Sequence, residues 1–292
     1  MEVSTTLQKR EKKPALSVAK VVRSVMKGIG WSILFAGGIL MVLPIVWMLS
    51  SSLKTPDKIF SIPVQLIPDP FRVQNYTEAV NLAPLGRYFL NSVGVGLSIT
   101  VLVLFFSTMA GYGFAKFKFW GRNAFFIAVL STLMIPFQVI MIPLYILVRH
   151  FGWLNSYQGL IIPAAISAFG VFLMRQFIQT IPDELLDAAR IDGASEIGIF
   201  FRIILPLCKP PMTALAIFTF LDSWNNLLWP LIIITKVELR PLALGLSEFQ
   251  TIHGTSYHYL MAAATLATIP ILILFAVLQK QFIRGVVLSG MK

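Results

Sequence analysis

The sequence is short of charge, cysteine and histidine. Charged residues make up 13% of its 292 positions, about half of the usual ~25% in soluble domains. A water-soluble globule of this length needs more charge to cover its surface, which excludes an ordinary cytosolic enzyme. Hydrophobic residues make up 57%, and disordered or fibrous chains lack that apolar density. The composition therefore predicts an integral membrane protein.

Cysteine and histidine are too few for a disulfide framework or a metal centre. Cys208 stands alone, and the three histidines show no HExxH or other helical zinc spacing. The chain also contains no Gly-Lys pair, so it lacks the GxxxxGK[ST] loop that holds ATP phosphates. We expect no metal, no bound cofactor and no catalytic residues in this chain.

Long apolar runs are what the sequence has in abundance. Each run is long enough for a helix across a hydrocarbon core, which takes ~20 residues, and too continuous for barrel strands. They predict an all-α membrane domain over 29–292, with six spans kinked by internal prolines, after a basic tail over 1–28. The first run is about twice as long as the 7–15 apolar residues of a signal peptide, so we expect it to be retained. The predicted spans lie near 29–53, 88–114, 124–148, 157–174, 210–235 and 260–279.

The net charge is +11, and its meaning depends on how the charged residues are distributed between the two sides of the membrane. With the N-terminus inside, 17 of the 24 basic residues fall on the inner side and 7 on the outer side. Inner loops of membrane proteins carry the excess of Lys and Arg. This predicts cytoplasmic N- and C-termini, and it removes the argument for a nucleic-acid partner.

The predicted cytoplasmic loop 175–209 contains a charged segment with helix-boundary signals. Pro182 suits a first helical position, and acidic residues follow it in the first turn. Arg190 can pair with Asp187 three residues earlier, and Gly193 suits a helix end. The segment predicts a helix of about ten residues with an apolar edge (Leu185, Leu186, Ala189). By itself it is either an amphipathic linker on the membrane surface or a docking element for a partner.

The same segment carries a recognisable spacing. Asp187-Ala188-Ala189, three residues, Gly193, nine residues and then Ile203-x-Leu205-Pro206 resembles the EAA motif of ABC importer permeases, with Asp in place of Glu. The string 188–195, the stretch 224–231 and the ending 281–292 resemble the carbohydrate-uptake branch, whose best-known type is the maltose-importer permease. One departure is Asn226, where many relatives have an acidic residue.

The resemblance implies a function and a set of partners. The chain would be a permease subunit of an ATP-driven importer in a bacterial plasma (inner) membrane, forming half of the pathway for a sugar or oligosaccharide. Its partners would be a second homologous permease, two copies of an ABC ATPase holding ATP and Mg, and an extracytoplasmic solute-binding protein. A coupling helix between spans 4 and 5 would contact the ATPase. The coupling residues implied are Glu184, Asp187, Ala188, Ala189, Arg190, Asp192 and Gly193.

Candidates for the substrate path lie mainly in the fifth predicted span. Asp222 is the only acidic residue inside a predicted span, and such a residue marks either a pathway or a polar pair with another helix. Amides and aromatic faces can hold sugars, although packing and interfacial anchoring are equally compatible with them. The candidates for the substrate path are Asp222, Trp224, Asn225, Asn226 and Gln138.

The outer loop 245–259 is either an exposed turn or, as the resemblance implies, a contact for the binding protein. The candidate contact residues are Gly254, Thr255, Ser256 and Tyr257, and we expect His253 and His258 at the surface. The alternative function is a secondary, ion-coupled transporter, which would need coupling carboxylates or inverted repeats. The sequence offers one intramembrane acid and no obvious repeat.

Overall fold

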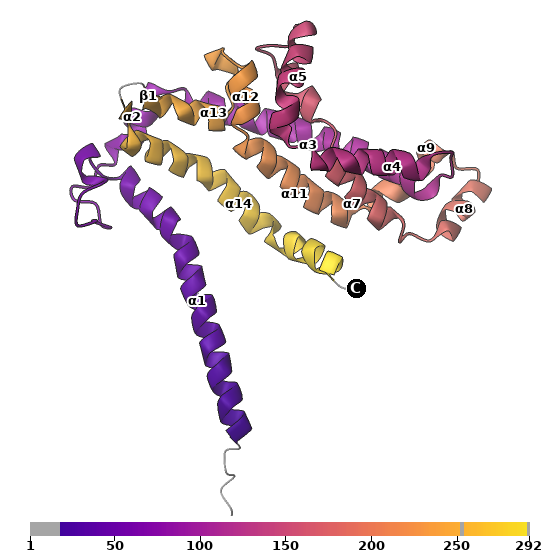
Figure 1. Ribbon diagram of the computed structural model, residues 1–292, viewed down its shortest axis with the longest axis horizontal. Helices are drawn as coiled ribbons and strands as arrows, with labels where there is room; N and C mark the ends of the chain where they lie inside the picture. The colour runs from indigo at the N-terminus through magenta and orange to yellow at the C-terminus, as the bar shows by residue number, and fades with distance from the viewer. Residues whose placement is uncertain (1–17, 252–253, 291–292) are drawn as a thin grey trace, which may run out of the picture.

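A computed structural model describes residues 18–251 and 254–290, with side-chain environments for 25–250 and 255–276. The described chain is helical, as predicted, apart from one two-residue hairpin of β1 (Gln250–Thr251) and β2 (Gly254–Thr255). The helices form an elongated bundle from which α1 stands away (Figure 1). The longest helices are α1 (Val18–Ser52), α3 (Leu85–Lys116), α11 (Lys209–Asn225) and α14 (Tyr257–Gly290).

Shorter helices connect and flank these four. Before the middle of the chain lie η1 (Pro56–Lys58), α2 (Gln74–Leu82), α4 (Arg122–Ser131), η2 (Thr132–Met134) and α5 (Phe137–His150). Next come α6 (Tyr157–Ile161), η3 (Ile162–Ala164), α7 (Ala168–Ile178), α8 (Asp183–Ile191) and α9 (Glu196–Ile199). Later come the π-helix η4 (Phe200–Ile204), α10 (Leu205–Leu207), α12 (Leu228–Ile233), η5 (Val237–Leu239), α13 (Leu242–Leu246) and η6 (Ser247–Phe249).

Three helices are long and apolar enough to cross a membrane, or up to six if each of three bent pairs counts as one span. The bends are 102° between Met134 and Phe137, 43° between Ala164 and Ala168, and 76° at Cys208. Pro136 lies at the first bend, where its missing N–H and fixed φ end a helix. A bend at an internal proline, as predicted, is therefore present at Pro136, whereas Pro44, Pro143 and Pro270 lie inside α1, α5 and α14 without breaking them.

The fifth predicted span, 210–235, is wrong as a single helix. Helix α11 ends at Asn225, Asn226 is extended, and α12 begins at Leu228. Pro230 has no N–H to bond the carbonyl four residues earlier, which is that of Asn226. The side chain of Asn226 instead accepts a hydrogen bond from Trp229 N at 3.3 Å. A residue at the break therefore satisfies a backbone N–H in the first turn of α12.

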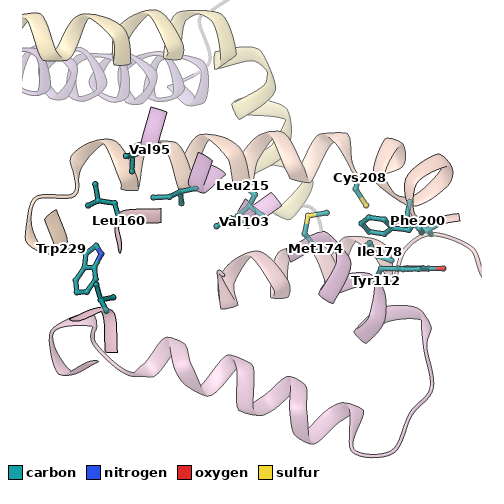
Figure 2. Close-up of a cluster of buried hydrophobic side chains, with 14 of the residues drawn as sticks. Val95, Val103, Tyr112, Leu160, Met174, Ile178, Phe200, Cys208, Leu215 and Trp229 are labelled. Atoms are coloured by element: carbon teal, nitrogen blue, oxygen red, sulfur yellow. The ribbon is translucent and has the colours of Figure 1, made fainter. Parts of the chain in front are cut away.

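The core runs along α3, where this helix packs against α7 and α11. Figure 2 shows its side chains: Val95 and Val103 of α3, Met174 and Ile178 of α7, and Leu215 of α11 lie in one buried cluster. Close approach depends on Gly111, because a Cβ there would lie 2.8 Å from Met174 Cβ and 2.9 Å from Arg175 N. Helix packing of this kind uses small residues at the contact.

Helix α1 contacts the bundle mainly through α14, and most of its described side chains are exposed. Its last turn is different. Asn75 of α2 donates from Nδ2 to the carbonyls of Ser52 at 2.9 Å and Lys54 at 2.8 Å, and Ser52 Oγ lies 2.7 Å from Tyr76 Oη. The outer apolar surface of α1 therefore faces lipid or another chain, while its last turn is fixed to α2.

Candidate coupling helix and translocation path

Helix α8 lies at one end of the long axis of the bundle, here called the α8 end (Figure 1). It begins after Pro182, which is the N-cap and not the first helical residue as predicted, and Asp183 and Glu184 occupy the first turn. Gly193 has a φ of +82°, in the left-handed region that glycine adopts most easily. The short helix predicted over this segment is therefore present, with the start and end signals read from the sequence.

One edge of α8 is buried and the rest is exposed. Leu186 is buried in the core cluster, with Ala189 packed against that cluster. Leu185, which we expected on the same apolar edge, is exposed, and Ile191 beyond it is 86% exposed. Leu186 thus fixes the helix to the bundle. Six of the seven implied coupling residues lie on the exposed surface, and Ala189 is half-buried: the exposed ones are Glu184, Asp187, Ala188, Arg190, Asp192 and Gly193.

Arg190 is the centre of a hydrogen-bonded ion-pair network. It binds Asp187 Oδ1 at 2.7 Å, which confirms the predicted pair, and its Nε binds Glu196 Oε1 at 2.7 Å. Tyr112 Oη on α3 donates to Glu196 Oε2 at 2.8 Å. Glu196 first, and then Asp187, raises the pKa of the Arg190 guanidinium, because both carboxylates favour its charged form. Sequence patterns did not indicate that Glu196 and Tyr112 would join this network.

A second link joins α8 to the end of α3. Lys116 Nζ lies 2.6 Å from Asp183 Oδ1, with the Lys116 side chain 6% exposed and the Asp183 side chain 76% exposed. Its ammonium also donates to the carbonyl of Ile181. The hydrogen bond from Lys116 holds the pKa of the Asp183 carboxyl below its usual range. Helix α8 is therefore tied to α3 at both its start and its end.

The other end of α3 binds a second segment, Val237–Phe249, here called the α13 segment. Asn91 donates from Nδ2 to the carbonyls of Glu238 at 2.9 Å and Arg240 at 3.0 Å. Ser92 Oγ accepts from Leu242 N at 2.7 Å. Tyr88 Oη donates to Glu248 Oε2 at 2.7 Å, and Glu248 also pairs with Arg240. Because these partners lie about 150 residues apart in the chain, local sequence patterns could not have identified them.

The substrate-path candidates divide by exposure. Asp222 and Asn225 are exposed on α11, and Gln138 is exposed on α5. Asn225 Nδ2 donates to the carbonyl of Leu221 at 2.9 Å. The structure places Gln138 on a different helix from the others, next to Phe137, whose ring centroid lies 6.0 Å from that of Trp229. These three polar side chains are not enclosed by the rest of the described chain.

The two tryptophans of this region are both buried. Trp224 lies between Phe89 and Phe220, with ring centroids 5.7 and 5.6 Å away. Trp229 lies on α12 and donates from Nε1 to the carbonyl of Gly159 at 2.9 Å. Trp229 therefore fixes α12 to α6, and the indole of Trp224 faces other aromatic rings in this conformation.

The candidate contacts for the binding protein lie on the hairpin and at the start of α14. Gly254 and Thr255 form β2, Ser256 N donates to the carbonyl of Phe249 at 2.9 Å, and the Tyr257 ring lies 4.9 Å from Phe60. His258 is buried, so its expected surface position is wrong: it falls in the first turn of α14, which packs against α2. His253 lies outside the described residues.

An apolar groove of about 630 Å³ lies between α3, α11 and α14. Its lining includes Leu97, Thr100, Ala216 and Phe220, and none of the path candidates contributes to it. A sugar needs convergent hydrogen-bonding groups, but the polar lining here is limited to Lys209 and two threonines, Thr100 and Thr213, whose hydroxyls donate to carbonyls of their own helices. Among the residues described, no three or more His, Cys, Asp or Glu side chains gather into a group that could hold a metal ion.

Comparisons with known proteins place this arrangement in a family. Residues 104–287 match the family described as binding-protein-dependent transport system inner membrane component. The chain is 41% identical over 257 residues to the arabinooligosaccharides transport permease AraQ of Bacillus subtilis, covering 87% of this chain and 92% of that protein. It is 35% identical over 262 residues to the sn-glycerol-3-phosphate transport permease UgpE of Yersinia pestis, covering 87% and 93%.

A third relative is the diacetylchitobiose uptake permease NgcG of Streptomyces coelicolor, 34% identical over 266 residues and covering 90% and 87%. The fold is similar to a chain in the crystal structure of a bacterial ABC transporter involved in the import of the acidic polysaccharide alginate. The TM-score is 0.79 at 22% identity, over 92% of this chain and 100% of that chain. The chain therefore belongs to the permease family of binding-protein-dependent ABC importers, in its carbohydrate-uptake branch, and is a transport subunit and not an enzyme.

Proposed function

We propose that this chain forms half of the translocation pathway of an ATP-driven sugar or oligosaccharide importer and couples to a separate ATPase through 182–206. The observation that carries the proposal is α8, a helix of nine residues at the tip of the bundle. Leu186 anchors it, two links tie it to α3, and its remaining surface is exposed. Such a helix can receive a partner and move as one body.

The topology of the proposed complex follows from the charge distribution. The α8 end is cytoplasmic, together with the tail 1–28 and both termini of the domain 29–292, because this side carries the basic excess. The hairpin region with Gly254, Thr255, Ser256 and Tyr257 then faces outward, where a solute-binding protein would dock. Two copies of an ATPase holding ATP and Mg, and a second homologous permease in the same plasma membrane, complete the assembly.

In the proposed mechanism, ATP acts through a difference in affinity for two states of the bundle. Closure of the two ATPase subunits on ATP displaces α8, through contacts with Glu184, Asp187, Ala188, Ala189, Arg190, Asp192 and Gly193. A ligand can shift a conformational equilibrium only by its differential affinity for the two states. The displacement therefore favours one of the inward-open and outward-open arrangements of the spans.

The proposed substrate is rich in hydroxyl groups. Support comes from the exposed amides Asn225 and Gln138 and the exposed carboxylate Asp222, which offer donors and acceptors for hydroxyls. Asn226 and Trp224 then act indirectly. Asn226 accepts a hydrogen bond from the first turn of α12, and Trp224 packs against Phe89 and Phe220 next to Asn225 in the chain. Stimulation of ATP hydrolysis in the reconstituted complex, screened with neutral oligosaccharides, acidic oligosaccharides and glycerol phosphate, identifies the class. Uptake driven by an ion gradient without ATP would instead support a secondary transporter.

A matched pair of glycines tests the coupling role of α8. Gly193 and Gly152 have φ values of +82° and +70°, and each N–H donates at 3.0 Å to the carbonyl three residues earlier. Proline at either site loses that hydrogen bond and cannot adopt a positive φ. We expect Gly193→Pro to abolish co-purification of the ATPase and ATP-driven uptake, while membrane insertion persists. Gly152→Pro, on the α5–α6 loop, should retain the ATPase. Normal uptake by the Gly193→Pro variant would overturn the proposal.

A further inference from the structure

The same arrangement of three side chains occurs at both ends of α3. In the Tyr112 triad, the Tyr112 hydroxyl donates to Glu196, which also binds Arg190. In the Tyr88 triad, the Tyr88 hydroxyl donates to Glu248, which also binds Arg240. The two tyrosines are 24 residues apart on one helix, which corresponds to about 36 Å at 1.5 Å per residue.

Each triad fixes a different distant segment to α3. The Tyr112 triad holds the segment from α8 to α9, with the Lys116–Asp183 pair beside it. The Tyr88 triad holds the α13 segment, with the bonds from Asn91 and Ser92 beside it. A hydrogen bond to a carboxylate is shorter and about twice as strong as one between neutral groups. Each tyrosine therefore binds its segment through a hydrogen bond stronger than one between neutral groups.

Helix α3 is continuous where the chain connections of α8 are bent. It runs for 32 residues from Leu85 to Lys116 and contains no proline. The connection before α8 contains the 43° bend between η3 and α7, and the connection after it contains the 76° bend at Cys208. Bends can absorb a displacement, whereas an unbroken hydrogen-bonded helix moves as a rigid body. The direct rigid route from α8 to the opposite end thus runs through α3.

We propose that α3 transmits the displacement of α8 to the α13 segment, with Tyr112 and Tyr88 as positioning residues at its two ends. This inference rests on the proposed function, because it assumes that an ATPase moves α8. When α8 moves, the Tyr112 triad carries the end of α3 with it. The Tyr88 triad then moves the α13 segment beside the hairpin.

A third triad supplies a matched control. The Tyr259 hydroxyl on α14 donates to Glu78 Oε2 at 2.8 Å, and Glu78 pairs with Arg72 at 3.2 Å. It has the same three residue types but joins α14 to α2 and does not involve α3. Replacing any of the three tyrosines by Phe removes one hydroxyl and keeps the ring.

The test perturbs one end of α3 and measures the other. A spin label on a Lys236→Cys variant reports on the α13 segment, because Lys236 is exposed and the native Cys208 is buried. In the complete complex with its ATPase and partner permease, we expect ATP to change the label spectrum. Tyr112→Phe should reduce that change at least about threefold, as loss of a hydrogen bond to a charged group permits. Tyr259→Phe should leave the change intact, and ATPase co-purification should be normal in both variants.

A double variant gives a second, independent readout. We expect Tyr88→Phe and Tyr112→Phe each to lower the number of solutes moved per ATP, and the double variant to be no worse than the more impaired single. Non-additivity across about 36 Å is not expected of residues that act only locally. Additive effects, an equal effect of Tyr259→Phe, or no ATP-dependent change at position 236 would overturn this inference. Failure of the unaltered chain to retain an ATPase would instead overturn the proposed function.

Discussion

The two ends of α3 share a Tyr–Glu–Arg triad but differ in the contacts beside it. At the α8 end the contacts are mainly ion pairs between side chains, Lys116 with Asp183 and Arg190 with both Asp187 and Glu196. At the other end, neutral side chains bind the backbone directly: Asn91 to two carbonyls and Ser92 to one amide. The Asp183 side chain is 76% exposed, whereas Asn91 is 7% exposed.

This difference indicates two mechanical roles. Ion pairs with an exposed partner contribute about 0–1 kcal/mol each and are screened by salt, so the Lys116–Asp183 and Arg190–Asp187 pairs can release and re-form as a partner moves while the Tyr112 triad stays in place. Buried bonds to backbone groups depend on one geometry, and leaving such groups unpaired is costly. We therefore expect the α13 segment to keep one shape while the α8 end adjusts. Three predictions test this contrast, from the largest effect to the smallest.

The largest effect is expected at Gly245, where the α13 segment meets Tyr88. A Cβ at this position would lie 2.0 Å from Cδ2 of Tyr88, a ring that is fully buried. Gly245→Ala should therefore destabilise the protein by about 3 kcal/mol, as overpacking of a rigid core does. The measurement is the thermal midpoint in detergent. Gly94→Ala on α3, where the Cβ meets nothing within 4 Å, is the control and should leave the midpoint unchanged or slightly higher. Equal midpoints for both variants would refute a rigid α13 segment.

The intermediate effect concerns Asn91. Asn91→Ala removes the two donor bonds to the α13 segment and the acceptor for the Tyr157 hydroxyl, which is 2.8 Å away. We expect a loss of about 2 kcal/mol, because the Arg240 carbonyl and the Tyr157 hydroxyl each lose a hydrogen bond at a part-buried site, while the Glu238 carbonyl keeps its bond from Arg87. Hydrogen exchange should rise over 237–246. Asn81→Ala, at an exposed position on α2, is the matched control. Unchanged exchange in the Asn91 variant would contradict the assigned role.

The smallest effect is expected at the α8 end and depends on salt and pH. At about 1 M salt, where the screening length is about 3 Å, hydrogen exchange should rise over 183–196 and stay constant over 237–246. Because Lys116 lowers the pKa of the Asp183 carboxyl, this pair stabilises the folded chain above the ordinary value of about 3.9. The contribution is lost as the pH falls through the lowered pKa. Asp183→Asn should remove the pH-dependent part of the hydrogen exchange over 183–196. Exchange in this segment that changes neither with salt nor with Asp183→Asn would contradict the difference between the two ends.

Sequence reasoning succeeded where the determinants are local. The limits of α8 follow from Pro182, the acidic first turn and Gly193, and the Asp187–Arg190 pair follows from helical spacing. The long apolar runs predicted the helical membrane fold. The EAA-like spacing predicted the family, which the relatives confirm.

It failed where the determinants are distant or hidden within an apolar run. Hydropathy averaged over the fifth run did not show the break at Asn226, because the short polar stretch from Asp222 to Asn226 lies between two apolar segments. The partners of Tyr112 and Tyr88 lie 84 and 160 residues away, so only tertiary packing brings them together. The burial of His258 has the same cause, since it depends on where α2 packs against α14.

The exposed apolar surface of α1 has a consequence for how this sequence can diverge. None of the most hydrophobic window of α1 is buried, whereas Gly111 on α3 meets the backbone of α7. A position that faces lipid or another chain along α1 needs to be apolar but not of one particular size, so substitutions there should accumulate quickly. The family match begins at residue 104, after α1 and within α3. The matched region therefore does not include α1.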